Sequence, residues 1–359
     1  MRALCRPGKG LLAMDESPTS CDARLAALGM EKSAANRHRW RDVLLTTPGL
    51  ERYISGFILH EDTFQNHRVA VQVEEAGDVR KESLSQARSS SENTESAAAS
   101  LARRGIVPGV KVDRGLQPLP HAPGHAWAAG LDDLAARCSA HYAAGARFAK
   151  WRTLLRVGAE EGGVAVDEAA HGLGRYASVA QSCGLVPVIE PEIALEGEHD
   201  IDAALATGAA VWAATFRSLA DHGVLLEGAV LKPSMVTPGN QHGNPASPET
   251  VADYTLRLLR RVVPPAVPGI FFLSGGLTDE EATLNLDAMH RGDLARDRRH
   301  PWLVSYSYAR GLQAAAMQAW AGLDANREAA QAALLRRAEL CSAAQQGRCD
   351  YEAYHAGPG

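Results

Sequence analysis

Six residues of this sequence that could act together as a nucleophile and its acid–base partners follow short apolar runs of the chain. They are Lys111, Lys150, Lys232, Asp15, Glu190 and Glu192. Like charges and partial burial lower the pKa of a lysine, which makes free amine available near neutral pH. A free amine attacks a carbonyl carbon to give a carbinolamine and then an iminium ion, while carboxylates move the protons. The set predicts cleavage of a carbon–carbon bond without a metal.

A second group of residues has the chemistry of an anion site. Ser274-Gly275-Gly276 follows an apolar run, and its backbone N–H groups can face an anion because glycine allows close approach. Arg310 and Lys111 would supply positive charge, with a contribution from Arg152. Alone, Ser-Gly-Gly is more often a turn. Beside three lysines and an arginine it favours a phosphate site.

Each of these residues also has a plain structural explanation. Lys232-Pro233 is a common way to end a strand, and Glu190-Pro191-Glu192 could be a solvated loop, because Lys and Glu are seldom buried. The functional interpretation therefore depends on whether the fold brings the strand ends together.

Eight short apolar runs predict the strands that would position these side chains. They are residues 10–14, 55–59, 106–112, 146–149, 185–189, 229–231, 270–273 and 302–305. Helical patterns such as 131–142 and 248–262 separate most of them, which predicts right-handed βαβ units and a parallel sheet. Eight units predict a closed α/β barrel of the (β/α)8 (TIM) type, in which all carboxyl ends of the strands open on one face. A doubly wound open sheet is the alternative, but no strand precedes GxGxxG or GxxxxGK[ST].

Composition limits the classes of partner. The 359 residues are 46% hydrophobic and 22% charged, which is sufficient for one large domain spanning 1–359. No apolar run reaches 18 residues, so we expect no membrane partner. The net charge of −5 argues against a nucleic-acid partner. The six cysteines lack CxxC spacing, which is typical of reduced thiols in an intracellular protein.

Seven segments of the chain resemble class I fructose-bisphosphate aldolase, in the family's order. The segments are PGKGLLAMDES, PGVKVDRG, ARFAKWR, LVPVIEPEI, LKPSMVTPG, PPAVPGIFFLSGG and SYSYARGLQ. The resemblance extends from about Pro7 to about Gly347 and is greatest to plant and algal plastid forms. It implies reversible Schiff-base cleavage of fructose 1,6-bisphosphate to dihydroxyacetone phosphate and glyceraldehyde 3-phosphate, with no cofactor and no metal. It also implies a homotetramer. The implied location is the chloroplast stroma, although this chain has no transit peptide, and the alternative location is the cytoplasm.

The resemblance implies a role for each residue of the chemical set. Lys232 would form the Schiff base with the ketose carbonyl. Glu190 would handle dehydration of the carbinolamine, supported by Lys150 and Glu192. Asp15 would take the C4 hydroxyl proton during cleavage. Among the implied substrate-binding residues, those at the C1 phosphate are Ser274, Gly275, Ala309 and Arg310, and Ser307 also binds the substrate. Those at the C6 phosphate are Ser17, Ser20 and Lys111, and Arg24 and Arg152 occupy further binding positions.

The chain departs from the family pattern in three places. Residues 74–100 are rich in Ser and Glu, and we expect a disordered insertion there. Residues 348–359 predict a short irregular tail in which no tyrosine is terminal, and the family's first helix is missing. These departures motivate an alternative, a catalytically impaired aldolase-like binding or scaffold protein. The zinc-dependent aldolase class is disfavoured because the 13 histidines do not cluster at strand ends.

Overall fold

The computed structural model describes residues 1–71, 94–120, 122, 124–158, 163–295 and 300–356. Eight parallel strands form a closed ring, because β5 pairs with both β2 and β8. In ring order they are β1 (Gly10–Met14), β2 (Ile54–Leu59), β5 (Val107–Lys111), β8 (Phe148–Leu155), β9 (Val186–Ile193), β10 (Val230–Leu231), β11 (Gly269–Phe272) and β12 (Leu303–Tyr308). The predicted (β/α)8 barrel is confirmed.

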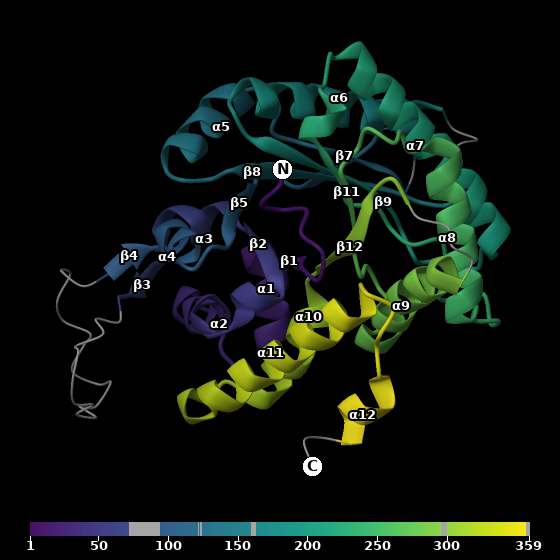
Figure 1. Ribbon diagram of the computed structural model, residues 1–359. Helices are drawn as coiled ribbons and strands as arrows, with labels where there is room; N and C mark the ends of the chain where they lie inside the picture. The colour runs from purple at the N-terminus through teal and green to yellow at the C-terminus, as the bar shows by residue number, and fades with distance from the viewer. Residues whose placement is uncertain (72–93, 121, 123, 159–162, 296–299, 357–359) are drawn as a thin grey trace.

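Helices surround the ring on its outer side (Figure 1). They are α1 (Pro18–Ala26), α2 (Ala34–Thr46), α3 (Glu61–Asn66), α4 (Ala97–Arg103), α5 (Leu134–Ala143), α6 (Val164–Ser182), α7 (Ile201–Asp221), α8 (Pro248–Val262), α9 (Asp279–Ala295), α10 (Arg310–Trp320), α11 (Arg327–Ala344) and α12 (Tyr351–Ala356). The local sequence explains where α8 begins. Ser247 accepts a hydrogen bond from the Thr250 N–H at the N-cap, and Pro248 occupies the first turn.

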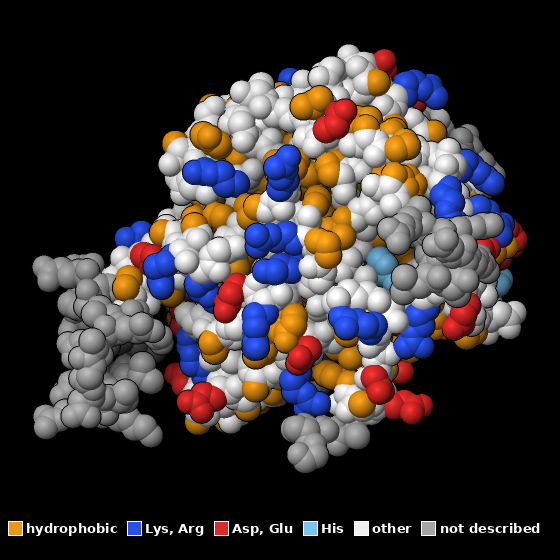
Figure 2. Space-filling model, viewed as in Figure 1, with side chains coloured by type: hydrophobic (Ala, Val, Ile, Leu, Met, Phe, Trp, Pro, Cys, Tyr) orange, Lys and Arg blue, Asp and Glu red, His pale blue; other side chains and the backbone are white. Residues whose placement is uncertain are grey.

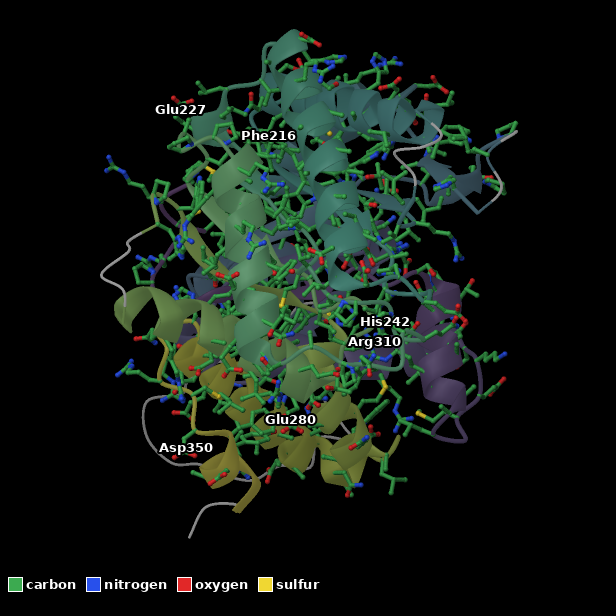
Figure 3. All side chains as sticks on the ribbon, turned by 90° about the vertical axis from the view of Figure 1, so that its right-hand side faces the viewer. Phe216, Glu227, His242, Glu280, Arg310 and Asp350 are labelled. Carbon is green, nitrogen blue, oxygen red and sulfur yellow. The ribbon has the colours of Figure 1, made fainter. Side chains whose placement is uncertain are left out.

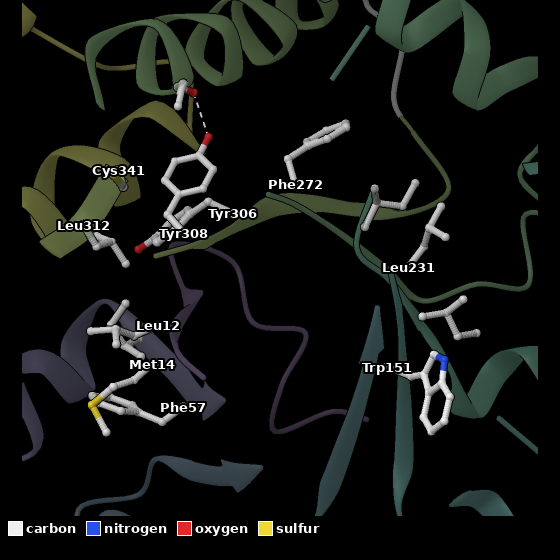
Figure 4. Close-up of a cluster of buried hydrophobic side chains, with 14 of the residues drawn as sticks. Leu12, Met14, Phe57, Trp151, Leu231, Phe272, Tyr306, Tyr308, Leu312 and Cys341 are labelled. Atoms are coloured by element: carbon white, nitrogen blue, oxygen red, sulfur yellow. Dashed lines mark hydrogen bonds between the residues drawn. The ribbon is translucent and has the colours of Figure 1, made fainter. Parts of the chain in front are cut away.

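Alternate residues of each strand face the inside of the barrel. The interior contains an apolar cluster of Leu11, Ala13, Ile58, Phe148, Val188, Val230 and Phe271, with Leu4 packed onto it. Phe148 takes so much of this space that a Cβ on Gly109 would lie 2.2 Å from its ring, so β5 needs a glycine there. The intervening residues, such as Leu12, Trp151, Phe272 and Tyr308, face outwards in the core beneath the helices (Figure 4).

The amino-terminal segment lies over the middle of the ring as seen in Figure 1. Figure 2 shows the same face: Lys and Arg side chains lie along its middle among hydrophobic ones, and Asp and Glu side chains are more frequent near its lower edge. The net charge of −5 is therefore unevenly distributed.

All eight predicted strands begin within two residues of the observed positions, but three of them end later than predicted. β8, β9 and β12 continue through Lys150, Glu190 and Ser307. Charged residues looked like strand terminators in the sequence. In the barrel they lie on the inward face of the strand, where they pair with one another and leave the backbone ladder intact.

A hairpin that the sequence did not predict extends the sheet beyond the ring. β6 (Leu116–Pro118) pairs antiparallel with β7 (Ala126–Ala128), and β7 pairs with β8 between Ala126 and Leu154. Pro118, Pro120, Pro123 and Gly124 lie within or between the two strands, a composition more typical of a loop than of a strand.

The prediction of a disordered insertion at 74–100 is wrong for its last residues. Residues 94–96 form β4 (Thr94–Ser96), which pairs antiparallel with β3 (Arg68–Ala70), and α4 begins at Ala97. Ala97, Ala98 and Ser100 are buried, so the end of this weakly hydrophobic stretch forms part of the core through small side chains. The remainder of the predicted insertion, residues 74–93, lies outside the described residues.

The prediction of an irregular tail at 348–359 is also corrected. α12 forms at residues 351–356, and Tyr351 is buried. The segment before it is fixed to α9, because Asp287 Oδ1 accepts from the Cys349 N–H at 2.8 Å and Arg291 donates to the Cys349 carbonyl at 2.6 Å. These contacts require tertiary structure and leave no local sequence signal.

Candidate active site

Four charged side chains continue the inward-facing rows of the strands at the carboxyl end of the barrel. Two of them, Asp15 and Lys232, stand directly after β1 and β10, and Lys150 and Glu190 lie within β8 and β9. Asp15 follows Ala13 by two residues, and Lys150, Glu190 and Lys232 follow the interior residues Phe148, Val188 and Val230 by the same spacing. Because side chains alternate with a period of two, the same strand geometry that builds the apolar interior also aims these groups inwards.

A single carboxylate joins the two buried lysines. Glu190 Oε2 lies 2.6 Å from Lys150 Nζ, and Glu190 Oε1 lies 2.9 Å from Lys232 Nζ. Lys150 also donates to Asp15 Oδ2 at 2.7 Å. The exposed fractions are 3% for Lys150, 3% for Glu190 and 4% for Lys232, so the network is nearly closed to solvent. Buried charges at this density are tolerated only because each one is paired.

Burial and neighbouring charges shift the pKa values in this network. Desolvation lowers the pKa of Lys150 to about 8, against the opposing effect of Asp15. Desolvation also lowers the pKa of Lys232. Burial alone would raise the pKa of Asp15, but Lys150, Lys232 and Lys111 outweigh it and hold the pKa of that carboxyl well below its usual range. The site therefore combines an ionised carboxylate with lysines that lose protons more readily than exposed ones.

A second pair of charges flanks this network. Arg152 pairs with Glu192. Burial alone would lower the pKa of the Arg152 guanidinium, but the neighbouring Glu192 carboxylate outweighs burial and raises that pKa. Lys111, the last residue of β5, pairs with Asp113. Asp113 also accepts from the Arg152 backbone N–H at 3.2 Å, so it connects the ends of β5 and β8.

The predicted anion site brings the end of β11 against the start of α10. Ser274 and Gly275 follow β11, and Ala309 and Arg310 stand at the amino end of α10. A Cβ placed on Gly311 would lie 3.4 Å from Ser274 Cβ, so the two segments are in contact. A Cβ on Gly275 would lie 3.0 Å from Glu192 Oε1, which joins this site to the Arg152–Glu192 pair.

Arg310 is exposed, and in Figure 3 it lies well away from Glu227, which precedes β10 at the other end of the barrel. Ser307 differs from it: the side chain is 1% exposed, and its hydroxyl has no hydrogen-bond partner among the described residues. A buried free hydroxyl at an inward position is available to a ligand.

The residues predicted for the second phosphate are less closely grouped. Ser17 and Ser20 are exposed at the start of α1, where their hydroxyls are 3.0 Å apart. Arg24 pairs with Glu16 on the same segment. Lys111 ends β5, and β2 stands between β1 and β5 in the ring.

Gln313 is a site residue that sequence reasoning missed. Its side chain is 1% exposed, donates to the Ala13 carbonyl at 2.6 Å and accepts from Arg24 at 3.0 Å. It therefore ties α10 to β1 and α1. The available signal was a polar residue on the buried face of α10, beside Leu312 and Ala316.

Among the described residues, no three His, Cys, Asp or Glu side chains are placed to hold a metal ion. No helix in that part of the chain has the length and apolarity to cross a membrane.

Three comparisons show which known proteins this chain is similar to. The family described as fructose-bisphosphate aldolase class-I matches residues 1–76 and 79–357. The chain is 48% identical over 343 residues to chloroplastic fructose-bisphosphate aldolase 1 of Chlamydomonas reinhardtii, covering 96% of this chain and 83% of the relative. It is 46% identical to chloroplastic aldolase 3 of Arabidopsis thaliana, covering 98% and 82%.

A solved structure agrees with both relatives. Fructose-bisphosphate aldolase of Plasmodium falciparum, crystallised with TRAP and a small-molecule inhibitor, is similar with a TM-score of 0.86 and 39% identity. The similarity covers 97% of this chain and 93% of that one.

Proposed function

The chain belongs to the class I fructose-bisphosphate aldolase family, and from that premise we propose that Lys232 is the residue that forms the Schiff base. The enzyme cleaves fructose 1,6-bisphosphate by the metal-independent chemistry of its class. The alternative of a catalytically impaired binding or scaffold protein has no support from the comparisons.

One observation carries the assignment to Lys232: its Nζ is buried at the carboxyl end of the barrel and lies 2.9 Å from Glu190 Oε1. The nucleophile must be a neutral amine, and desolvation lowers the pKa of Lys232 in that direction. Glu190 is placed to accept the proton that the ammonium loses. Lys150 is also buried, but it is held between two carboxylates, which favours its charged form.

Glu190 is the proposed acid–base group for dehydration of the carbinolamine. That step needs a proton delivered to the leaving hydroxyl beside the nitrogen of Lys232, and Glu190 contacts that nitrogen directly. Lys150, at 2.6 Å from the other carboxylate oxygen, supports the same proton transfer. Glu192 supports it from a distance by fixing Arg152 beside the site.

Asp15 is the proposed base for the C4 hydroxyl proton during cleavage. The positive neighbours hold its pKa well below the usual range, so it is ionised before the reaction, as an acceptor must be. Its contact with Lys150 orients the carboxylate across the barrel mouth.

The substrate phosphates are assigned to the two ends of the site. We assign the C1 phosphate to Ser274, Gly275, Ser307, Ala309 and Arg310, and the C6 phosphate to Ser17, Ser20 and Lys111, with Arg24 and Arg152 at further binding positions. The contact of Gly311 with Ser274 supports the first group. For the second group, support comes from its place around the carboxyl ends of β1 and β5.

Two further properties are proposed on the family resemblance alone. The names of the similar plant and algal proteins include the word "chloroplastic". We therefore propose that the protein is located in the chloroplast stroma, in preference to the cytoplasm. We also propose a homotetramer, which light scattering on the purified protein would test.

Borohydride trapping tests the central assignment. Dihydroxyacetone phosphate with borohydride should label Lys232 in peptide mapping. Lys232→Arg should abolish the label, because a guanidinium does not lose its proton to form an imine. Labelling should survive EDTA. A label on Lys150, or activity that EDTA removes, would overturn the assignment.

A further inference from the structure

Arg337 is a fully buried arginine of α11 that the chemistry above does not use. Its Nε and Nη2 donate to the Gly311 carbonyl at 3.1 and 2.9 Å. Nη2 also donates to the Asp279 carbonyl at 3.1 Å and to Thr283 Oγ1 at 2.8 Å. One guanidinium therefore fixes the first turn of α10 to the first turn of α9.

The carbonyl that Arg337 holds belongs to the anion-binding end of the site. Gly311 follows Arg310 directly, and a Cβ on Gly311 would lie 3.4 Å from Ser274 Cβ and 3.2 Å from the Tyr308 ring. A shift of the Gly311 peptide would therefore displace Ala309 and Arg310 relative to Ser274.

The carboxyl-terminal helix α12 also packs against the Arg337 guanidinium. The rings of Tyr351 and Tyr354 lie 5.8 and 5.4 Å from Arg337 Cζ. Arg336 holds the same helix by donating to the Tyr354 carbonyl at 2.8 Å. Arg337 thus contacts both the tyrosine pair of α12 and the first turn of α10.

We propose that Arg337 is a positioning residue that couples the docking of α12 to the geometry of the site that binds the C1 phosphate. This rests on the proposed function of Ser274, Ala309 and Arg310. When α12 is docked, the tyrosines keep water from the guanidinium, and its hydrogen bonds to Gly311 are made in a dry environment where they are strong. When α12 is released, water competes for those donors and the first turn of α10 loosens.

If the coupling exists, release of α12 should weaken binding of the C1 phosphate and change the rate of the chemical step little. The C1 phosphate is bound in the ground state and in the transition state alike, so loosening its site raises KM more than it changes kcat. Tyr351→Ala combined with Tyr354→Ala removes the cover and leaves Arg337 and every proposed substrate contact in place. We expect KM for fructose 1,6-bisphosphate to rise about three- to tenfold, with kcat within about twofold.

The matched control is Tyr142→Ala on α5, which removes another tyrosine that lies against an arginine, Arg147 at 4.8 Å, far along the chain from α12. We expect its KM to be that of the parent protein. Inorganic phosphate, used as a competitive inhibitor, should bind the double variant more weakly by a factor similar to the rise in KM and the control variant unchanged.

Arg337→Lys is the second variant, because a lysine keeps the charge and loses the fork that spans Gly311 and α9. It should raise KM in the same direction as the tyrosine variant. An unchanged KM in the double variant, with trypsin cutting faster after Arg348, would overturn the coupling. Borohydride labelling of Lys232 must persist in all variants; its absence in the parent protein would instead contradict the proposed function.

Discussion

Lys232 Nζ lies 2.9 Å from Glu190 Oε1, and the exposed fraction of each residue is 4% or less. The distance is that of a direct hydrogen bond, so a proton can pass between the two groups without an intervening water. The most direct test is to remove the charge of this carboxylate and keep its shape.

Glu190→Gln should lower kcat by about 10²–10⁴-fold, because an amide cannot accept or deliver the proton of the dehydration step. The matched control is Glu227→Gln, a glutamate before β10 at the far end of the barrel, which should leave kcat unchanged. Initial rates of cleavage measured with a coupled assay decide the point. A Glu190→Gln variant with kcat close to that of the parent would rule out the proposed role.

The rate should fall at alkaline pH as Lys150 loses its proton. Its pKa is lowered to about 8, so the ion pairs with Asp15 and Glu190 are intact below pH 8 and are lost above it. We expect a descending limb of kcat near pH 8. Lys150→Arg should be slower overall but lack that limb, because a guanidinium stays charged over the range. Lys32→Arg, an exposed control, should keep it. The same limb in the Lys150 variant would assign it to another group.

Gly275→Ala should reduce kcat/KM at least about tenfold, because small displacements of binding groups are costly. The added Cβ would lie 2.5 Å from Leu273 Cδ1 and 3.0 Å from Glu192 Oε1, so the Glu192–Arg152 pair must move. Gly292→Ala on α9 is the control, since its Cβ meets nothing within 4 Å. Steady-state kinetics of both variants, with thermal melts to confirm folding, make the comparison; equal kinetics would mean that the Gly275 site is not close-packed in solution.

Leu101→Ala should lower the free energy of unfolding by about 2–5 kcal/mol, because this α4 side chain is fully buried and its removal leaves a cavity. Leu323→Ala, at a position that is 58% exposed, should change it by less than about 0.5 kcal/mol. Urea unfolding monitored by circular dichroism measures both. A Leu101 variant as stable as the Leu323 variant would mean that α4 contributes little to the core.

The sequence predicts the strands because most residues of the apolar runs are buried on both faces and the runs have no competing helical period. It does not predict where β8 and β9 end, since Lys150 and Glu190 look solvent-exposed until their partners are known. Those partners depend on strand register: Arg152 stands opposite Glu190, and Leu154 opposite Glu192. A single sequence has no information on register, so the residues of the site could be named but their pairing could not.

The same limit explains the elements that were missed. The α12 helix has a local start signal in Asp350, whose carboxylate accepts from the Ala353 N–H at 2.9 Å. The contacts that hold the helix in place come from Arg336, Arg337 and Asp287, all outside it in sequence. Gln313 was missed for a similar reason, since its partners Ala13 and Arg24 come from the other end of the chain.

The network of Asp15, Glu190, Lys150 and Lys232 sums to zero when all four groups are ionised. The iminium proposed for Lys232 would carry the same single positive charge as the ammonium that it replaces. The net charge at the site is therefore the same before the ketose is attached and after the iminium has formed. The surrounding dipoles need little reorientation between these two states. The charge of the network changes only while Lys232 is a neutral amine. During that interval the proton that Lys232 has lost moves the short distance to Glu190.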